Sequence, residues 1–260
     1  MKRGLVGAGL ALTLVLVGAS AMVAVNAMAR QTINEKHVYG FKGKAVSMEL
    51  TVGEVAVVPS TVEDQITVSR RLTYGLRRPL VEERIDGETF RIRDGDCAMP
   101  LETACHVRWL VQVPSKLHLT IATTTGDINV SPGMTGAVNL TSGSGEVKAR
   151  GVSGPAVQLL SHNGSVSGIG LRSSHVVATS ETGNISLSFR DSPKFVLGRT
   201  KTGSVEVVLP DGDETYNVKA TAGGLRNVPP GTNDSANRKI TVESEQGNVT
   251  VEQSPRNPGS

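Results

Sequence analysis

The stretch that decides the fold is Thr125-Gly126-Asp127-Ile128-Asn129-Val130, because close variants of it return along the chain. Its glycine recurs as Gly126, Gly145, Gly164, Gly183, Gly203 and Gly223, at steps of 19, 19, 19, 20 and 20 residues, and Gly247 follows after 24. A period of this length is typical of a fold in which one small structural unit is stacked many times.

Pairs of apolar residues flank each glycine at fixed distances. The pairs before it include Leu119/Ile121, Val138/Leu140 and Val157/Leu159, and the pairs after it include Ile128/Val130, Val147/Ala149 and Val205/Val207. Residues two apart lie on the same face of a strand. Each unit is therefore predicted as strand, corner, strand. The glycine occupies the corner, where a positive φ costs it little and a β-carbon is expected to strain the turn.

The repeats predict an all-β fold, a right-handed parallel β-solenoid with about 19–20 residues in each repeat. We prefer the solenoid because equivalent aliphatic residues recur at a fixed register and would align in interior ladders. Periodicity alone also fits the alternative, an antiparallel meander of successive hairpins.

The rhythm weakens toward both ends of the chain. A further match surrounds Gly53, and the pattern is then lost between Pro59 and Ser115. Near the other end Asn227 replaces an inward aliphatic residue, and Pro229-Pro230-Gly231 predicts a bulging loop near an end of the stack. The predicted organisation is an N-terminal segment (1–30), a β-repeat domain (31–252; irregular over 31–118, regular over 119–252) and a disordered tail (253–260).

Composition and charge narrow the class of protein. The chain has 29 Gly, 3% aromatic residues and 38% hydrophobic residues, which suits an extended β architecture better than a compact enzyme core. Its net charge is +3, and its basic residues are scattered without interleaved aromatics. The tight pair Arg70-Arg71, with Glu82-Glu83 close by, is interpreted as solvated surface charge. Nucleic acid is therefore not predicted as a partner.

The N-terminus predicts export. Lys2-Arg3 precede an uncharged apolar stretch from Leu5 to Val25, which is long enough to span a bilayer as a helix. Ala27-Met28-Ala29 also satisfies the small-residue rule for signal cleavage. We favour a retained anchor, so the rest of the chain is expected outside the cytoplasm and tethered to the membrane. Secretion after cleavage behind Ala29 is the alternative.

Cys97 and Cys105 are the only cysteines and lie eight residues apart in a stretch that reads as a loop. In an oxidising compartment such a pair is most simply a structural disulfide, and two ligands alone make a poor zinc site.

The chain resembles the DUF4097 family of adhesin-like, toastrack-like β-repeat proteins of bacteria. The resemblance rests on Thr-Val-Gly-Glu-Val-Ala-Val at 51–57, on the cysteine pair followed by Val-Gln-Val-Pro at 111–114, and on the repeated glycine units, and it covers about residues 40–252. It implies a β-repeat domain displayed outside the membrane, often behind one transmembrane helix and sometimes associated with envelope stress. It supplies no catalytic residues.

No catalytic constellation is found among the residues themselves. The histidines are dispersed, and a disulfide at Cys105 would remove the thiolate that a Cys-His pair with His106 needs. His162 is interpreted as part of a solvated corner, and Asp211-Gly212-Asp213-Glu214 as a solvated turn, because it lacks the spaced ligands of a calcium loop. The sequence predicts no enzyme, no catalytic residue, no cofactor and no metal site.

Two classes of function remain. The preferred one is a non-enzymatic module whose polar faces bind cell-wall polysaccharide or an envelope protein. The alternative is a glycan-active β-helix enzyme, a lyase or a hydrolase. Only Asp127 and Glu146 suggest it, because they are nineteen residues apart and would stack on adjacent coils.

Overall fold

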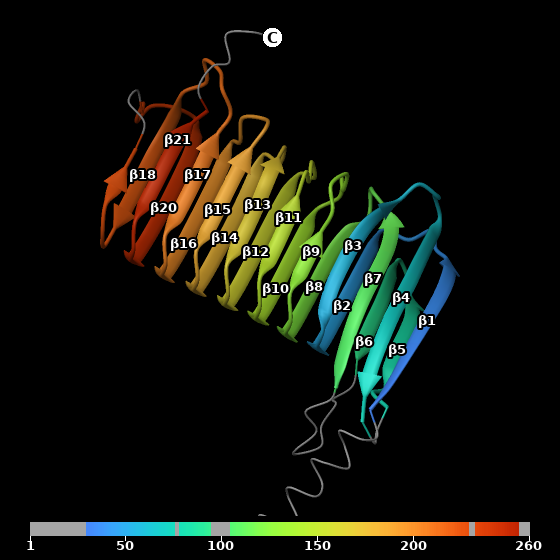
Figure 1. The fold of residues 1–260 in the computed structure, drawn as a ribbon. Helices are drawn as coiled ribbons and strands as arrows, with labels where there is room; N and C mark the ends of the chain where they lie inside the picture. Colours follow the sequence, from blue (N-terminus) through green and yellow to red (C-terminus); the bar gives the residue numbers. More distant parts are fainter. Residues whose placement is uncertain (1–29, 76–77, 95–104, 229–231, 255–260) are drawn as a thin grey trace, which may run out of the picture.

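The computed structural model describes residues 30–75, 78–94, 105–228 and 232–254, and these form an all-β rod in which two sheets face each other (Figure 1). The described residues contain 21 strands and no helix. Accordingly, none of them belongs to a helix long and apolar enough to cross a membrane. The predicted anchor at 5–25 and most of the predicted tail lie outside the described residues.

Each repeat contributes one strand to each sheet. Sheet A runs in the spatial order β1 (Gln31–Gly40), β4 (Gln65–Tyr74), β7 (His106–Pro114), β3 (Glu54–Ser60), β9 (Ile128–Val130), β11 (Val147–Arg150), β13 (Val166–Leu171), β15 (Ile185–Phe189), β17 (Val205–Leu209), β21 (Val249–Gln253) and β19 (Arg226–Asn227). Sheet B runs β18 (Tyr216–Ala222), β20 (Arg238–Gln246), β16 (Phe195–Thr202), β14 (His175–Thr182), β12 (Ala156–Asn163), β10 (Val138–Ser144), β8 (His118–Thr125), β2 (Ala45–Val52), β6 (Thr89–Asp94) and β5 (Val81–Asp86).

The regular repeats stack in parallel and in register. Val138 of β10 pairs with Leu119 of β8 on one side and with Val157 of β12 on the other, one repeat away in each direction. Sheet A has the same register, since Val147 pairs with Ile128 and with Val166. The parallel stack is thus confirmed, and the hairpin meander is wrong for these repeats. The handedness of the coil stays a prediction.

The core lies between the two sheets and consists of ladders of equivalent aliphatic side chains. One ladder on sheet B comprises Leu119, Val138, Val157, Val176, Val196 and Ile240, and one on sheet A comprises Ile128, Val147, Val166, Ile185, Val205 and Val249. All are buried, so each stabilises the fold by about 1.5–3 kcal/mol.

The corner glycines form a column in which each rests on the backbone of its neighbour. A β-carbon on Gly126 would lie 1.9 Å from the carbonyl oxygen of Gly53, and one on Gly145 would lie 2.3 Å from that of Gly126. Gly126 also has φ +142°, in the region that favours glycine. Gly164 is absent from the positive-φ glycines, yet a β-carbon there would lie 2.1 Å from the Gly145 oxygen. The short distance between stacked coils is therefore a second reason for glycine at these corners, in addition to the positive φ expected from the sequence.

A column of buried hydroxyl groups runs beside the glycines. In five coils the residue three before the glycine is a serine or threonine whose hydroxyl donates to a glycine carbonyl in the preceding coil of the stack. The bonds are Ser142 to Gly126 (2.9 Å), Ser161 to Gly145 (2.9 Å), Ser180 to Gly164 (3.0 Å), Thr200 to Gly183 (2.9 Å) and Ser244 to Gly203 (2.7 Å). These hydroxyls satisfy corner carbonyls that would otherwise face an apolar interior.

At the C-terminal end the spatial order departs from the chain order. The coil of β20 and β21 stacks directly on β16 and β17, and the earlier coil of β18 and β19 lies outside it (Figure 1). The region around Asn227 therefore belongs to the outermost coil, and the loop predicted at Pro229-Pro230-Gly231 lies outside the described residues. No further coil packs on the outer side of this one, which explains why Asn227 can replace an inward aliphatic residue. Leu225 in the same coil is 77% exposed.

The N-terminal end is also built out of chain order. The coil of β2 and β3, which contains Gly53, lies between the first regular coil and the strands β6 and β7. Beyond these, β5 pairs antiparallel with β6, and β4 and β1 extend sheet A antiparallel from β7. The irregular segment 31–118 thus forms the end of the stack, with the solenoid's two sheets continued by antiparallel strands.

Candidate functional site

The two carboxylates that suggested an enzyme do lie on adjacent coils, but both are already engaged. Asp127 Oδ1 accepts a hydrogen bond of 2.7 Å from the backbone N–H of Glu146. Glu146 Oε1 in turn lies 2.7 Å from Lys148 Nζ. The same corner arrangement recurs where Asn184 Oδ1 accepts from Ser204 N–H at 2.8 Å. The position after the glycine therefore holds neighbouring coils together, and Asp127 has this structural role.

The other polar residues singled out from the sequence take part in surface ion pairs. His162 Nδ1 lies 3.7 Å from Glu181 Oε1, and Lys201 Nζ lies 3.3 Å from the same oxygen. The hydrogen bond and charge of Lys201 hold the pKa of Glu181 below its usual value. Glu214 forms a two-bond pair with Arg238, at 2.8 and 2.9 Å. In the described part of the chain no group of three or more His, Cys, Asp or Glu side chains could hold a metal ion.

The cysteine pair is only half described. Cys105 is not a free thiol. Cys97 lies outside the described residues, so the disulfide between the two stays a prediction.

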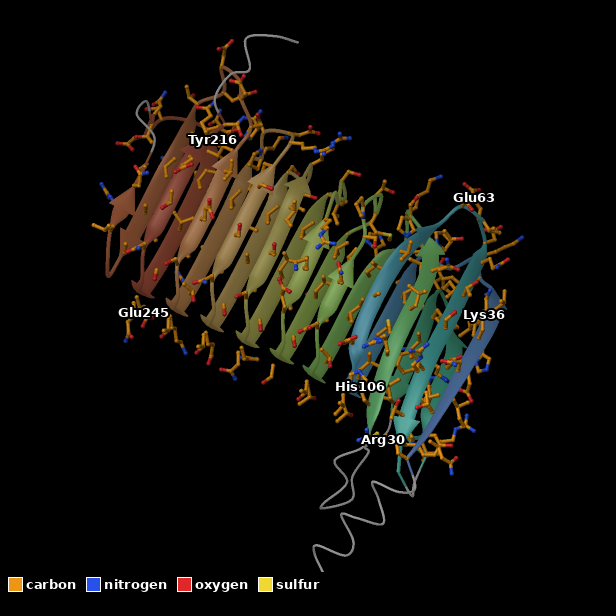
Figure 2. The ribbon with its side chains drawn as sticks, in the orientation of Figure 1. Arg30, Lys36, Glu63, His106, Tyr216 and Glu245 are labelled. Carbon is orange, nitrogen blue, oxygen red and sulfur yellow. The ribbon has the colours of Figure 1, made fainter. Side chains whose placement is uncertain are left out.

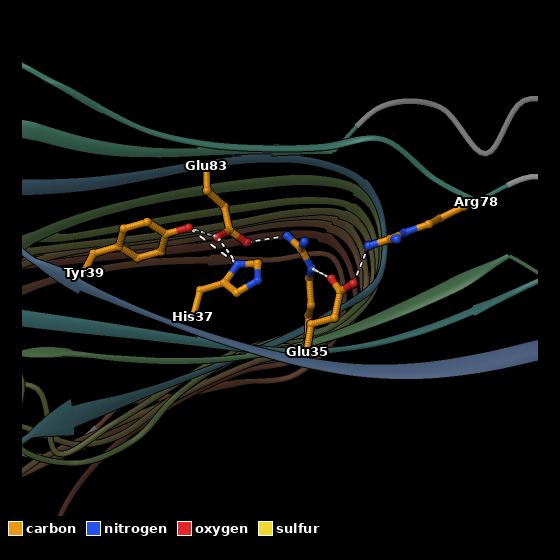
Figure 3. Close-up of polar contacts among 6 residues, drawn as sticks. Glu35, His37, Tyr39, Arg78 and Glu83 are labelled. Carbon is orange, nitrogen blue, oxygen red and sulfur yellow. Dashed lines mark hydrogen bonds and ion pairs between the residues drawn. The ribbon is translucent and has the colours of Figure 1, made fainter.

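The densest cluster of titratable side chains lies inside the N-terminal end of the rod, between the two sheets (Figure 3). Glu35, His37 and Tyr39 are alternate residues of β1, so all three point the same way, into the interior. Arg70 of β4 and Glu83 of β5 meet them there, and both side chains are at least nine-tenths buried. We name these five residues, with Arg78, the end cluster.

Every charged group of the end cluster has a partner. Arg70 Nε donates to Glu35 Oε2 at 2.6 Å, and the same guanidinium bonds Glu83 Oε1. The other oxygen of Glu83 accepts from Tyr39 at 2.5 Å and lies 2.9 Å from His37 Nδ1. Arg78 pairs with the second oxygen of Glu35. Two arginines thus neutralise two carboxylates; Arg70 and Glu83 are buried, while Arg78 at the edge of the cluster is half exposed.

The pKa shifts follow from these contacts. Burial raises the pKa of Glu35, but the hydrogen bond and charge of Arg70, with the charges of Arg78 and His37, outweigh burial and hold this pKa below its usual value. Burial and the hydrogen bond to Glu83 raise the pKa of Tyr39 to about 12. Tyr39 is therefore a neutral donor at physiological pH.

The end cluster joins the two sheets at the N-terminal end of the rod. Glu83 belongs to sheet B, while its partners Arg70, His37 and Tyr39 belong to sheet A, so the cluster ties the two sheets together where the apolar ladders end. Both oxygens of Glu83 are occupied. The Arg70 guanidinium also lies 5.9 Å from the ring centre of the buried Trp109, which adds a cation–π contact.

The outer face of the same strands carries a groove of about 430 Å³. Because side chains alternate along a strand, Lys36 and Arg71 point outward from β1 and β4 next to the inward Glu35 and Arg70. The outer lining is completed by Arg108 of β7, Asn34, Ser69 and Leu110, and Glu35 and Arg70 also border it; we name it the basic groove. Figure 2 shows Lys36 on β1, at the opposite end of the rod from Tyr216 and Glu245.

A second hollow, of about 230 Å³, adjoins the basic groove at Arg108 and extends across β3, β9 and β11. Its outward residues include Glu54, Asn129 and Lys148. Glu54 accepts from Arg108 Nε at 2.6 Å. The Asn129 Oδ1 atom is buried and has no hydrogen-bond partner among the described residues.

The fold and the repeats agree with a family comparison. A family model described as Toastrack DUF4097 matches residues 92–252, more than half of the 260-residue chain, and the chain belongs to this family. The resemblance stated from the glycine units is thereby confirmed. No curated protein matches the chain.

The chain is also similar to solved structures of other bacterial proteins. A candidate adhesin from Parabacteroides distasonis is 11% identical, with a TM-score of 0.49 and coverage of 86% of this chain and 97% of that one. A candidate adhesin from Bacteroides fragilis is 16% identical, with a TM-score of 0.46 and coverage of 85% and 97%. A candidate cell adhesion protein from Clostridium sporogenes is 12% identical, with a TM-score of 0.44 and coverage of 86% and 100%. Likenesses at this level carry no argument about ligand or partner.

Sequence reasoning missed both the end cluster and the basic groove. The tight pair Arg70-Arg71 and the nearby Glu82-Glu83 were noted only as scattered surface charge. A signal was present in the alternation of charges along 34–37 and 69–71, where one set of charges must face the interior if these segments are strands.

Proposed function

We propose that this chain is a non-enzymatic surface module that binds a cell-envelope polymer or an envelope protein. The observation that carries the proposal is a row of polar side chains along the outer face of sheet A. One residue of the row comes from each of six successive strands: Asn129, Lys148, Ser167, Ser186, Glu206 and Thr250.

The spacing of this row suits an extended ligand. Neighbouring strands of a sheet lie about 4.8 Å apart, so the six residues offer hydrogen-bonding groups at regular steps over roughly 24 Å. The backbone of the rod is fixed by apolar, glycine and hydroxyl ladders, so little entropy is lost when a ligand lies along it. A flat and regular polar surface of this kind supports binding rather than a reaction at one point.

The glycan-active alternative has less support. It depends on Asp127 and Glu146, whose carboxylates bond a backbone N–H and Lys148 respectively. General acid and base catalysis of glycoside cleavage needs a carboxyl pair free to exchange protons with the substrate. A structural use for both residues therefore favours the binding module.

The proposal places the module outside the cytoplasm, tethered by the apolar segment 5–25, with a disulfide between Cys97 and Cys105. These features, and the association with envelope stress that the family resemblance implies, are predictions from the sequence. These predicted features agree with a protein exposed at the cell surface, because a rigid rod held to the membrane by one helix would extend its long faces into the cell envelope.

The test is co-sedimentation of the full chain, in a neutral detergent, with isolated bacterial cell-wall sacculi across a salt series. Saturable binding supports the polymer ligand. Loss of all binding would exclude the wall polymer and direct the search to protein partners by in-cell cross-linking.

A matched pair of variants tests whether the polar row is the binding surface. Ser186→Tyr places a bulky ring in the row on sheet A, while Gln158→Tyr places the same ring on the outer face of sheet B; both positions are exposed. We expect Ser186→Tyr to weaken sedimentation and Gln158→Tyr to leave it unchanged. Equal binding by both variants would contradict the assignment to this row.

A further inference from the structure

The basic groove brings three cations together on adjacent strands. Arg71 and Arg108 are paired directly across β4 and β7. Lys36 lies on β1, where its pairing partner is Ser69, two residues from Arg71. Like charges placed opposite each other in a sheet destabilise it. Placing these cations side by side therefore does not stabilise the fold, and an anion bound in the groove would reduce the repulsion between them.

The groove's own neutralising contacts are few. Arg108 pairs with Glu54, and Arg71 Nε donates to the neutral oxygen of Asn34 at 2.9 Å. One carboxylate of these strands, Glu35 of β1, also lines the groove, but it is already paired with Arg70 and Arg78. By contrast, Arg70 on the inward face of β4 is paired with both Glu35 and Glu83 in the end cluster. The inward charges are neutralised by the chain, and the outward ones retain a positive excess.

The shape of the surface favours a chain-like anion over a single ion. The basic groove and the second hollow meet at Arg108, and together they cross β1, β4, β7, β3, β9 and β11, a span of roughly 24 Å at about 4.8 Å between strands. At the far end the second hollow is lined by Asn129 and by the carboxylates of Glu54, Asp127 and Glu146. These carboxylates are bonded to Arg108, to the Glu146 N–H and to Lys148, and their oxygens can also accept hydrogen bonds from hydroxyl groups of a ligand. Arginine forks match phosphate oxygens in geometry as well as charge.

We infer that the basic groove and the adjoining hollow bind a phosphate-bearing, hydroxyl-rich polymer of the cell envelope. Its phosphate groups lie between Lys36, Arg71 and Arg108, and its hydroxyl-bearing units extend toward Asn129. This inference rests on the proposed function: the site continues the polar row of sheet A beyond Lys148 and Asn129 toward the N-terminal end, and it assigns the chemical class of the ligand.

The experiment measures binding of the full chain, in a neutral detergent, to immobilised poly(glycerol phosphate). Polygalacturonate serves as a carboxylate polymer and dextran as a neutral one. We expect binding to poly(glycerol phosphate) that exceeds binding to polygalacturonate and that falls with added salt, because the contacts are charged and partly exposed. Equal binding to the two polyanions, or preference for dextran, would overturn the assignment of phosphate.

The test variant is Lys36→Gln/Arg71→Gln, which removes two outward cations without touching the end cluster. We expect its affinity for poly(glycerol phosphate) to fall by about tenfold or more. The matched control is Lys219→Gln/Lys239→Gln, which makes the same change of net charge at exposed positions on the far coils. Equal loss in the two variants would show a general charge effect and overturn the site.

A second variant adds charge instead of removing it. Ser69→Glu places a carboxylate among the three cations and is expected to abolish polymer binding while leaving thermal stability unchanged or higher. Unchanged binding by this variant would also overturn the inference.

Two further outcomes separate this inference from the proposed function. If sacculi bind the wild type and Lys36→Gln/Arg71→Gln alike, the proposed function stands and the basic groove is not its site. In a competition experiment, vesicles of phosphatidylglycerol are compared with vesicles of phosphatidylcholine, whose headgroup has no net charge. If only the phosphatidylglycerol vesicles displace the polymer fully, the groove binds a membrane surface and the polymer assignment fails.

Discussion

The regular coils and the N-terminal end share the same two sheets but fill the space between them differently. In the regular coils the interior contains aliphatic ladders and a column of hydroxyl groups, and each coil repeats its neighbour. At the N-terminal end, antiparallel strands enclose paired charges. The regular coils therefore depend on uniform spacing, whereas the end depends on charge pairing, and the two regions should fail for different reasons.

The largest effect is expected from a change that breaks the uniform spacing. Gly126→Ala would place a β-carbon 1.9 Å from the Gly53 carbonyl oxygen, so the two coils must separate. We expect the free energy of unfolding, measured by chemical denaturation, to fall by about 5 kcal/mol.

The control for this change is Gly212→Ala. Gly212 has φ +151°, close to the +142° of Gly126, but a β-carbon there meets nothing within 4 Å. Its replacement should cost only the backbone strain, about 1–3 kcal/mol. Equal losses in the two variants would show that conformation alone requires the corner glycines.

The next effect tests charge pairing at the N-terminal end. Arg70→Met leaves Glu35 and Glu83 without their shared partner, and the Glu83 side chain is only 5% exposed. Removing one partner of a buried ion pair costs about 3–5 kcal/mol. Denaturation of Arg199→Met provides the comparison, because Arg199 pairs with Glu243 on the surface and its loss should cost less than about 1 kcal/mol. Similar costs would mean that the end cluster is no more than a surface network.

The sequence predicted the regular coils well because their determinants are local and repeated. The position of Val138 or Val147 relative to its glycine is enough to assign its face and its stacking neighbours. The hydroxyl column could also have been predicted, since a serine or threonine precedes each repeat glycine from Gly126 to Gly247, except Gly223, by three residues. The sequence does not show the acceptor of these hydroxyls, which is a glycine carbonyl of the neighbouring coil.

The ends could not be predicted in the same way, because their partners are distant in sequence. Nothing local indicates that Glu35 meets Arg70, or that β18 and β19 are displaced outward by a later coil. The basic groove depends on the same long-range pairing. Arg71 and Arg108 become neighbours only through the antiparallel register of β4 and β7.

A smaller effect is expected within the regular coils from removal of one interior hydrogen bond. Ser161→Ala deletes the hydroxyl that donates to Gly145 at 2.9 Å and leaves that carbonyl without this donor. The loss should be about 1 kcal/mol in chemical denaturation. Ser186→Ala, at an exposed position on sheet A, should change stability by less than about 0.5 kcal/mol. A neutral Ser161→Ala would show that the hydroxyl column contributes no net stability.

The smallest expected effect is the pH dependence of the stability that Glu35 contributes at the N-terminal end. The pKa of Glu35 is held below its usual value of 4.5, so its ionised form stabilises the fold above that pH, and this contribution is lost as the pH falls through the folded-state pKa. The stability difference between wild type and Glu35→Gln should therefore be greatest near neutral pH and shrink below about pH 4.5.

Salt distinguishes this buried carboxylate from an exposed one in the regular coils. The pKa of Glu181 is also lowered, by Lys201, but this pair lies on the surface. Salt screens exposed charges much more than partly buried ones. In concentrated salt, the pH-dependent difference should persist for Glu35→Gln and vanish for Glu181→Gln in thermal melts. If both differences vanished, water and ions would have free access to the end cluster, and the contrast between a closed end and a solvated surface would fail.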